Sequence, residues 1–220
     1  MHVNEVGQQA PLSAAVLAGG RSSRMGQDKA LLPLVTDGPP LLAIVLRRLG
    51  LVADDVFVVA TDRPDYASFG VPIYPDELEE AGTLGGIATA LRRARHDHCL
   101  VVACDMPFLQ PSFLSWMADR PRSYDALVPR VAGESRQGSG MIWQTLHAIY
   151  GKGCLEPIER QLLAGERKVV GFFDAVLVTP IEESQIVPFD PRLMSFFNAN
   201  TPEALSEARR IVGNGTGSGV

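Results

Sequence analysis

Short apolar runs alternate along the first part of the chain with amphipathic segments of helical spacing. The apolar runs predict buried strands at Ser13–Leu17, Asp55–Ala60, Val71–Tyr74, Cys99–Ala103 and Asp125–Pro129. The segments between them predict helices at Pro39–Val52, with Pro40 in the first turn, near Ile87–Arg95 and at Pro111–Asp119. Strands that alternate with helices favour an α/β fold, in which a mostly parallel sheet carries helices on both faces.

The pattern changes after Gly138. It predicts a strand at Met141–Tyr150, a helix at Leu155–Ala164, a strand at Ala175–Thr179, and a last helix at Pro202–Val212 with Thr201 as its N-cap. No repeat or long linker divides the chain, so we expect one domain over residues 1–212. Residues 213–220 are polar and rich in glycine, and we expect this tail to be disordered.

Composition excludes several classes of protein. Of the 220 residues 46% are hydrophobic, enough for a large core, and the net charge of −5 argues against a nucleic-acid partner. No apolar run approaches the roughly 20 residues of a membrane helix, and the start of the chain lacks the basic region of a signal peptide. The sparse, odd set Cys99, Cys104 and Cys154 predicts reduced, buried thiols and a cytoplasmic protein.

Ligands of an open parallel sheet bind beyond the carboxyl ends of its strands, where three loops are rich in chemistry. These loops are Ala18–Lys29, Pro75–Gly86 and Cys104–Phe108. In the first, Gly19 and Gly20 let the backbone approach a ligand, and three cations, Arg21, Arg24 and Lys29, suit phosphate oxygens. The motifs GxxxxGK[ST] and GxGxxG are absent, which argues against a P-loop enzyme and a dinucleotide-binding dehydrogenase.

The residues from Leu17 to Lys29 read LAGG-x3-RMG-x2-K, which resembles the signature of nucleotidyltransferases that act on sugar phosphates and cofactors. Within that superfamily the chain is similar to the molybdenum cofactor guanylyltransferase family. Further matches are Asp76 ahead of the loop Gly82–Gly86, the tripeptide Asp105–Pro107, and FFNANTPE at Phe196–Glu203. The resemblance covers roughly Ala14 to Val212, and its specificity lies in the joint spacing of these pieces.

The resemblance implies a Rossmann-like three-layer sandwich of the nucleotide-diphospho-sugar transferase type. It implies transfer of GMP from GTP to molybdopterin or molybdenum cofactor, with Mg²⁺ present and pyrophosphate released. The nucleotide-binding part would span about residues 13–120 and the acceptor-binding part about residues 121–212. Because the free cofactor is expected to be labile, a protein partner that hands it over is also expected, whereas no membrane partner is.

Roles for single residues follow from the same resemblance. Lys29 would hold phosphate oxygens as a point charge with help from Arg24, and Asp105 would bind Mg²⁺. The nucleotide would be lined by Leu17, Ala18, Gly19 and Gly20, with Asp76 on the guanosine, and the pterin would face Asn198 and Asn200. Because phosphoryl-type transfer needs positioning and electrostatics, we expect no serine or cysteine nucleophile.

Three of these assignments have simpler structural alternatives, and for Asp105 the alternative is a cap. A carboxylate such as Asp76 can accept from both N–H groups on the Watson–Crick edge of guanine, but whether it contacts base or ribose stays open, and it could instead cap a turn. Asn198 and Asn200 could simply tether the turn before Thr201. We interpret His147 as a packed or substrate-facing residue rather than a general base, and His96, His98, Cys99 and Cys104 as no zinc site.

The sequence departs from the family pattern at two places. The family often has an asparagine at the end of the second strand, but Val58–Asp62 contains none, so that contact moves to Thr61 or disappears. Gly138–Trp143 looks like an insertion near the acceptor. Two other functions therefore stay open: a cytidylyltransferase for the same cofactor or another small phosphate, and a nucleotide-binding protein of this fold without catalysis.

Overall fold

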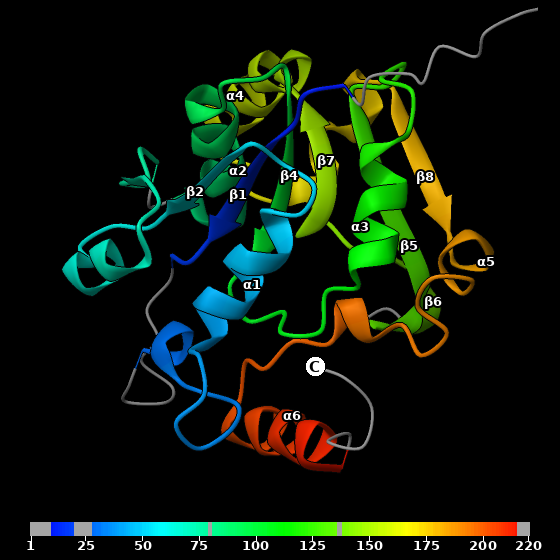
Figure 1. Cartoon of the computed structure of the whole chain (residues 1–220). Coiled ribbons are helices and arrows are strands. Elements are labelled where there is room, and N and C mark those ends of the chain that lie inside the picture. Colours follow the sequence, from blue (N-terminus) through cyan, green and yellow to red (C-terminus); the bar gives the residue numbers. More distant parts are fainter. Residues whose placement is uncertain (1–9, 20–27, 79–80, 136–137, 215–220) are drawn as a thin grey trace, which may run out of the picture.

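The computed structural model of the chain describes residues 10–19, 28–78, 81–135 and 138–214. Their strands form one mixed sheet in the order β3-β2-β1-β4-β7-β5-β6, with β8 paired to β5 (Figure 1). The four parallel strands β1 to β4 span Ser13–Leu17, Asp55–Val59, Ile73–Tyr74 and His98–Ala103. The other four, β5 to β8, span Ala126–Ser135, Gly138–Trp143, His147–Gly151 and Val178–Glu182.

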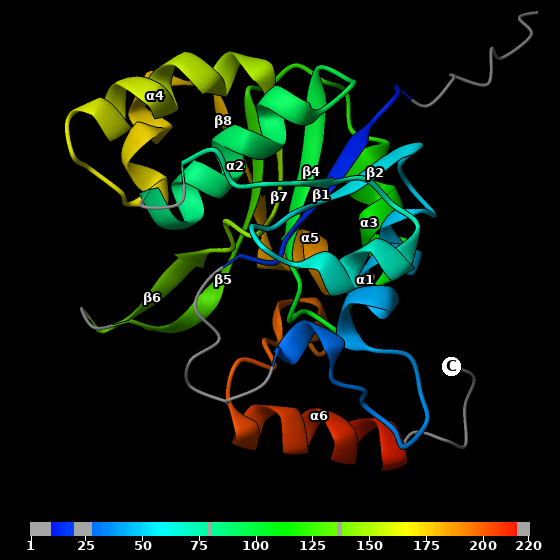
Figure 2. The same cartoon turned by 90° about the vertical axis from the view of Figure 1, so that its left-hand side faces the viewer.

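Helices cover both faces of this sheet, as Figure 2 shows. Helices α1 (Leu41–Leu49) and α3 (Pro111–Ala118) pack on one face, and α2 (Gly82–Arg93) and α4 (Leu155–Leu163) pack on the other. The strands are apolar on both sides because successive side chains enter opposite layers: Ala14 and Val16 of β1 face α1, whereas Ala15 faces α2. The predicted three-layer α/β sandwich is confirmed.

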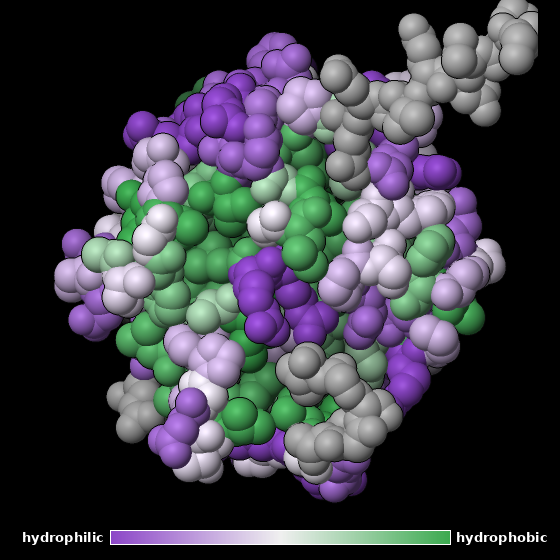
Figure 3. Space-filling view, in the orientation of Figure 1, coloured by the Kyte–Doolittle hydropathy of each residue, from purple (hydrophilic) through white to green (hydrophobic). Residues whose placement is uncertain are grey.

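Two further helices lie outside these layers. The short α5 (Glu183–Ile186) follows β8, and α6 (Pro202–Asn214) lies below the sheet in Figure 1. Leu205 and Ala208 of α6 pack with Leu34 and Leu41 in a small separate core. In the same view, the surface is a mosaic of hydrophobic and hydrophilic side chains (Figure 3). No helix of the described ranges is long and apolar enough to cross a membrane.

Antiparallel pairing is the main departure from the predicted elements. The segment Met141–Tyr150, predicted as one strand, contains the ends of two strands, β6 and β7, on either side of a turn. Gln144 N donates to Pro129 O at 2.8 Å and His147 N donates to Gln144 O at 3.0 Å, so the chain reverses there. As a result β6 pairs with the second half of β5, whereas β7 lies between β4 and β5, antiparallel to both.

Other boundaries also differ from the prediction. Helix α1 is shorter than Pro39–Val52 because Pro40 is its N-cap, and β5 continues past Pro129 to Ser135. The strand predicted at Ala175–Thr179 begins only at Val178, since Val169–Ala175 forms a 3₁₀ helix. Helix α6 includes Gly213 and Asn214 of the predicted tail, whereas residues 215–220 lie outside the described residues.

The glycines before Ile87 belong to a helix, although the sequence suggested a loop. Helix α2 begins at Gly82, whose φ of +62° suits glycine, and Gly85 and Gly86 lie in its first turns. A Cβ on Gly85 would lie 2.4 Å from the carbonyl oxygen of Leu78, and one on Gly86 would lie 3.0 Å from Leu17 Cδ1. The absence of side chains therefore lets α2 approach both β1 and the loop after β3.

We predict that Gly85→Ala lowers the free energy of unfolding by about 1–3 kcal/mol, because its Cβ would overlap a backbone oxygen that cannot rotate away. Thermal or urea unfolding measures the change. Gly50→Ala is the matched control, since Gly50 has helical φ and ψ and its Cβ would have 3.6 Å of space. Equal stability of the Gly85→Ala variant and the native chain would contradict this packing argument.

Candidate active site

Most of the predicted site residues lie together at the topological switch point of the sheet, where successive strands are added on opposite sides of β1. Strand β1 lies between β2 and β4, both parallel to it, so the connections that leave β1 and β4 open a crevice at their carboxyl ends. A cavity of about 530 Å³ lies in that crevice. Its lining includes seven of the residues singled out from the sequence: Leu17, Gly19, Lys29, Asp76, Asp105, Asn198 and Asn200.

An ion pair stands at the centre of this cavity. Lys29 Nζ lies 2.5 Å from Asp105 Oδ2, and the side chains are 24% and 10% exposed. The second carboxylate oxygen of Asp105, Oδ1, is buried and has no hydrogen-bond partner among the described residues. A buried oxygen without a partner is costly unless a ligand or cation satisfies it. Asp105 therefore offers one ready oxygen ligand beside a fixed positive charge.

The side chains at this position can be compared with the ligands that a divalent cation needs. Within the described ranges, no cluster of three or more histidine, cysteine, aspartate or glutamate side chains could hold a metal alone. Mg²⁺ commonly takes only one or two protein carboxylates and completes its shell with water and substrate phosphates. The unpartnered Asp105 Oδ1 fits that mode of binding.

Lys29 is held in place by the residue before it. Asp28 Oδ1 accepts from Ala30 N at 3.1 Å, which caps the 3₁₀ helix Lys29–Leu31. Its Oδ2 accepts from the hydroxyl of the buried Tyr66 at 2.7 Å and pairs with Arg63. Burial and Asp28 raise the pKa of Tyr66, so its hydroxyl stays a donor. Sequence analysis missed Asp28 and Tyr66, although the position of Asp28 just before the signature lysine was a signal.

The C-terminal segment reaches the site through backbone contacts. Ala199 N donates to Asp105 O at 2.8 Å, which joins the FFNANTPE segment to the end of β4. Asn198 Nδ2 donates to Phe196 O at 3.0 Å, so this residue tethers its own turn and also lines the cavity. Thr201 Oγ1 accepts from Ala204 N, which confirms the predicted N-cap of α6.

A buried aspartate shapes the loop ahead of that segment. Asp190 accepts from Met194 N at 2.9 Å and from Ser195 N at 2.7 Å, and it is 3% exposed. Ser195 Oγ in turn accepts from Gln110 N, just before α3. Leu193 has a φ of +53° in this tight turn. These contacts hold the backbone that leads to Asn198 and Asn200. No motif in the sequence singled out Asp190.

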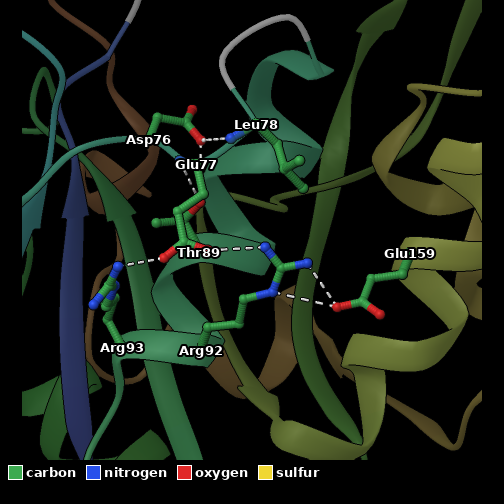
Figure 4. Close-up of polar contacts among 7 residues, drawn as sticks. All are labelled: Asp76, Glu77, Leu78, Thr89, Arg92, Arg93 and Glu159. Carbon is green, nitrogen blue, oxygen red and sulfur yellow. Dashed lines mark hydrogen bonds and ion pairs between the residues drawn. The ribbon is translucent and has the colours of Figure 1, made fainter.

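Asp76 both caps a turn and lines the cavity. Its Oδ1 accepts from Leu78 N and from Thr89 Oγ1, each at 3.1 Å (Figure 4). With two donors already on Oδ1, the carboxylate cannot grip guanine with both oxygens in the way that the sequence suggested. Asp76 N donates to Thr61 Oγ1 at 3.0 Å, so Thr61, which follows β2, anchors the Asp76 loop.

Some predicted site residues lie elsewhere. Ala18 is buried in the core, its N–H donates to Val59 O at 3.0 Å, and it does not line the cavity. Gly20 and Arg24 lie outside the described residues. The Gly138–Trp143 segment forms β6 along the second half of β5, and none of its residues lines this cavity, so its place beside the acceptor stays a prediction.

Burial shifts the pKa of two side chains near the cavity that could otherwise take part in a reaction. His147 is packed between Phe113 and Phe196, and burial lowers its pKa to about 4, so it is neutral at pH 7. Burial also raises the pKa of Cys104 to about 12, which keeps the thiol protonated although it borders the cavity. His147 is a packed residue, in line with its sequence interpretation, and Cys104 is unsuited to nucleophilic attack.

Comparison with known proteins agrees with this geometry. Residues 14–177 match the model of the family described as MobA-like NTP transferase domain. A protein of Pelotomaculum thermopropionicum named probable molybdenum cofactor guanylyltransferase is 36% identical over 206 residues, which cover 92% of this chain and 94% of the relative. The family match includes the segment that carries LAGG-x3-RMG-x2-K and the strands that follow it.

Solved structures share the fold. Molybdopterin-guanine dinucleotide biosynthesis protein A from Archaeoglobus fulgidus superposes with a TM-score of 0.74 at 27% identity, over 92% of this chain and 99% of that one. A CMP:2-keto-3-deoxy-manno-octonic acid synthetase, solved with CTP, gives 0.66 at 14% identity over 93% and 99% of the two chains, a likeness of fold alone. The predicted nucleotide-diphospho-sugar transferase fold is confirmed, and the chain belongs to the family of MobA-like NTP transferase domains.

Proposed function

We propose that this protein transfers GMP from GTP to molybdopterin or molybdenum cofactor, forms the guanine dinucleotide cofactor and releases pyrophosphate. The observation that carries the proposal is the Lys29–Asp105 pair, in which Asp105 Oδ1 has no partner among the described residues, together with Gly19, Asp76 and Asn198 around the same cavity. A lysine and a carboxylate in contact at the carboxyl ends of β1 and β4 suit a metal-bound triphosphate. Relatives named guanylyltransferases support the donor and the acceptor.

The residues of the chain would act by positioning and charge. A Cβ on Gly19 would meet no atom of the described residues within 4 Å, so phosphate oxygens could approach its backbone. Lys29 would turn its ammonium from Asp105 toward the β- and γ-phosphates, and Asp105 would then be free to hold Mg²⁺ through both oxygens or one. Mg²⁺ supplies charge neutralisation on the pyrophosphate leaving group. The acceptor phosphate attacks the α-phosphorus in line, so the P–O bond to pyrophosphate breaks as the new P–O bond forms.

The acceptor would enter from the side of the C-terminal segment. Asn198 and Asn200 are exposed, line the cavity and come from the stretch tethered to Asp105 through Ala199. Amide side chains present both donors and acceptors, which match the edge of a pterin. A partner protein that delivers or removes the cofactor would have access to this open side.

The choice of base in the donor is the least constrained part of the proposal. Asp76 Oδ2, which makes no hydrogen bond among the described residues, can accept from the N–H groups of guanine and equally from the amino group of cytosine. A cytidylyltransferase would use the same Lys29 and Asp105. Donor selection therefore needs a direct comparison of GTP with CTP, whereas the reaction class follows from the pair itself.

We predict that Asp105→Asn lowers turnover about 100-fold or more, because the amide cannot supply the negative charge that holds a cation on the triphosphate. GTP binding should weaken but stay measurable in excess Mg²⁺. Pyrophosphate release and calorimetric titration with GTP measure the two effects. The exposed Asp174→Asn is the matched control and should behave like the native protein. Native turnover in the Asp105→Asn variant would refute the role of Asp105.

We predict that Lys29→Ala weakens GTP binding at least about tenfold and GMP binding far less, because the lysine faces the β- and γ-phosphates that GMP lacks. Titration of each nucleotide into native and variant protein measures the ratio. Lys168→Ala removes an exposed lysine that does not line the cavity and serves as the control. Equal losses for GTP and GMP would show that Lys29 does not act on the outer phosphates.

A further inference from the structure

Three hydrogen bonds, made by two threonines from different parts of the chain, hold the Asp76 loop. Thr61, after β2, accepts from Asp76 N at 3.0 Å. Thr89, in α2, donates its hydroxyl to Asp76 Oδ1 and accepts from Glu77 N, both at 3.1 Å. Thr89 is fully buried, so this hydroxyl has no competing water. Figure 4 shows Thr89 below the loop, with Asp76 and Glu77 directly above it.

The direction of each bond follows from counting donors and acceptors. Because the Thr89 oxygen receives the Glu77 N–H, its own hydrogen is free to point at Asp76 Oδ1. Oδ1 also receives the Leu78 N–H, and both of its lone-pair positions are thus taken. Oδ2 makes no contact of this kind among the described residues and points away from Leu78 and Thr89 in Figure 4. The ligand-binding oxygen of Asp76 is therefore Oδ2.

We propose that Thr89 is a positioning residue for the nucleotide: it fixes the Asp76 carboxylate so that Oδ2 alone faces the cavity and accepts one N–H or O–H of the guanosine. This inference rests on the proposed function and deepens it. Without the Thr89 hydroxyl the carboxylate would rotate about its side-chain bonds, and one buried N–H of Glu77 would lose its acceptor. Binding of the nucleoside would then carry an ordering cost that the native loop does not have.

The ion pairs around the same loop are weaker candidates for this role. Glu77 pairs with Arg92 at 2.9 Å and with Arg93 at 2.5 Å, and Arg92 also reaches Glu159 of α4 at 2.7 Å (Figure 4). The Arg92 side chain is 32% exposed and the Glu159 side chain is 43% exposed. Exposed pairs of this kind contribute little and are screened by salt. The buried hydroxyl is the contact that touches Asp76 itself.

The test compares Thr89→Val, which removes the hydroxyl at nearly constant shape, with Thr89→Ser, which keeps it. We expect Thr89→Val to raise KM for GTP about tenfold with kcat within about twofold of native, and Thr89→Ser to restore KM. Asp76→Asn should raise KM at least as much. The double variant Thr89→Val/Asp76→Asn should have the same KM for GTP as Asp76→Asn alone, since both changes disrupt the same feature, the fixed carboxylate of Asp76.

Ser13→Ala is a matched control for the loss of a buried hydroxyl. Ser13 Oγ likewise donates to a carboxylate, Asp55 Oδ2, at 2.5 Å and accepts a backbone N–H from His96 at 3.1 Å, but at the opposite end of β1. We expect this variant to lower Tm as Thr89→Val does and to leave KM for GTP unchanged.

Two results would overturn the inference. One is a Thr89→Val variant that loses stability but keeps its KM for GTP within about twofold of native. The other is a double variant in which the two effects multiply, because independent effects would mean that Thr89 does not act through Asp76. Native protein that neither binds nor consumes GTP would refute the proposed function together with this inference, whereas native turnover with an unchanged Thr89→Val KM would refute the inference alone.

Discussion

The parallel pairing of β1 with β4 is the constraint on which the site depends. Leu17 and Ala103 are paired at the ends of these strands, and Cys104 N donates to Leu17 O to extend the ladder by one residue. The glycine loop and Asp105 must therefore leave the sheet side by side. Residues 76 apart in sequence, Lys29 and Asp105, meet in consequence at 2.5 Å. Strand pairing thus brings two segments of the site together, and the C-terminal segment joins them through the Ala199–Asp105 hydrogen bond.

The Lys29–Asp105 contact joins two opposite charges that are both largely buried. Each charge satisfies the other, which limits the cost of burying them, yet Oδ1 of Asp105 has no partner among the described residues. In the proposed reaction a triphosphate and its cation would take over both partners at once, with lysine on phosphate and aspartate on metal. Asp28 and Tyr66 hold the Lys29 segment on one side, and the Ala199–Asp105 bond holds Asp105 on the other.

Much of the fold and of the candidate site could be predicted from the sequence. Apolar strands with helical segments between them predicted the three layers. The strand-end loops and the family resemblance singled out Lys29, Asp76, Asp105, Asn198 and Asn200, and the structure brings these residues to one cavity. The reversal between β6 and β7 was missed because Met141–Tyr150 contains no glycine or proline, so only the polar pair Gln144 and Thr145 marks the turn. The glycines of α2 were read as a loop because glycine has low helix propensity, whereas close packing on Leu17 and Leu78 requires them. Thr89 and Asp190 were missed because single polar residues become significant only through contacts that are distant in sequence.

The central claim is that this cavity joins GMP to molybdopterin. The most direct measurement is to incubate the full chain with Mg²⁺, molybdopterin and each of GTP, CTP, ATP and UTP in turn, and to identify the product by mass spectrometry alongside pyrophosphate release. The account predicts a molybdopterin product that has gained GMP, formed with GTP and in step with pyrophosphate. A product that carries CMP instead would keep the fold and the chemistry of Lys29 and Asp105 but contradict the assigned donor. Formation of no dinucleotide with any of the four would contradict the account as a whole.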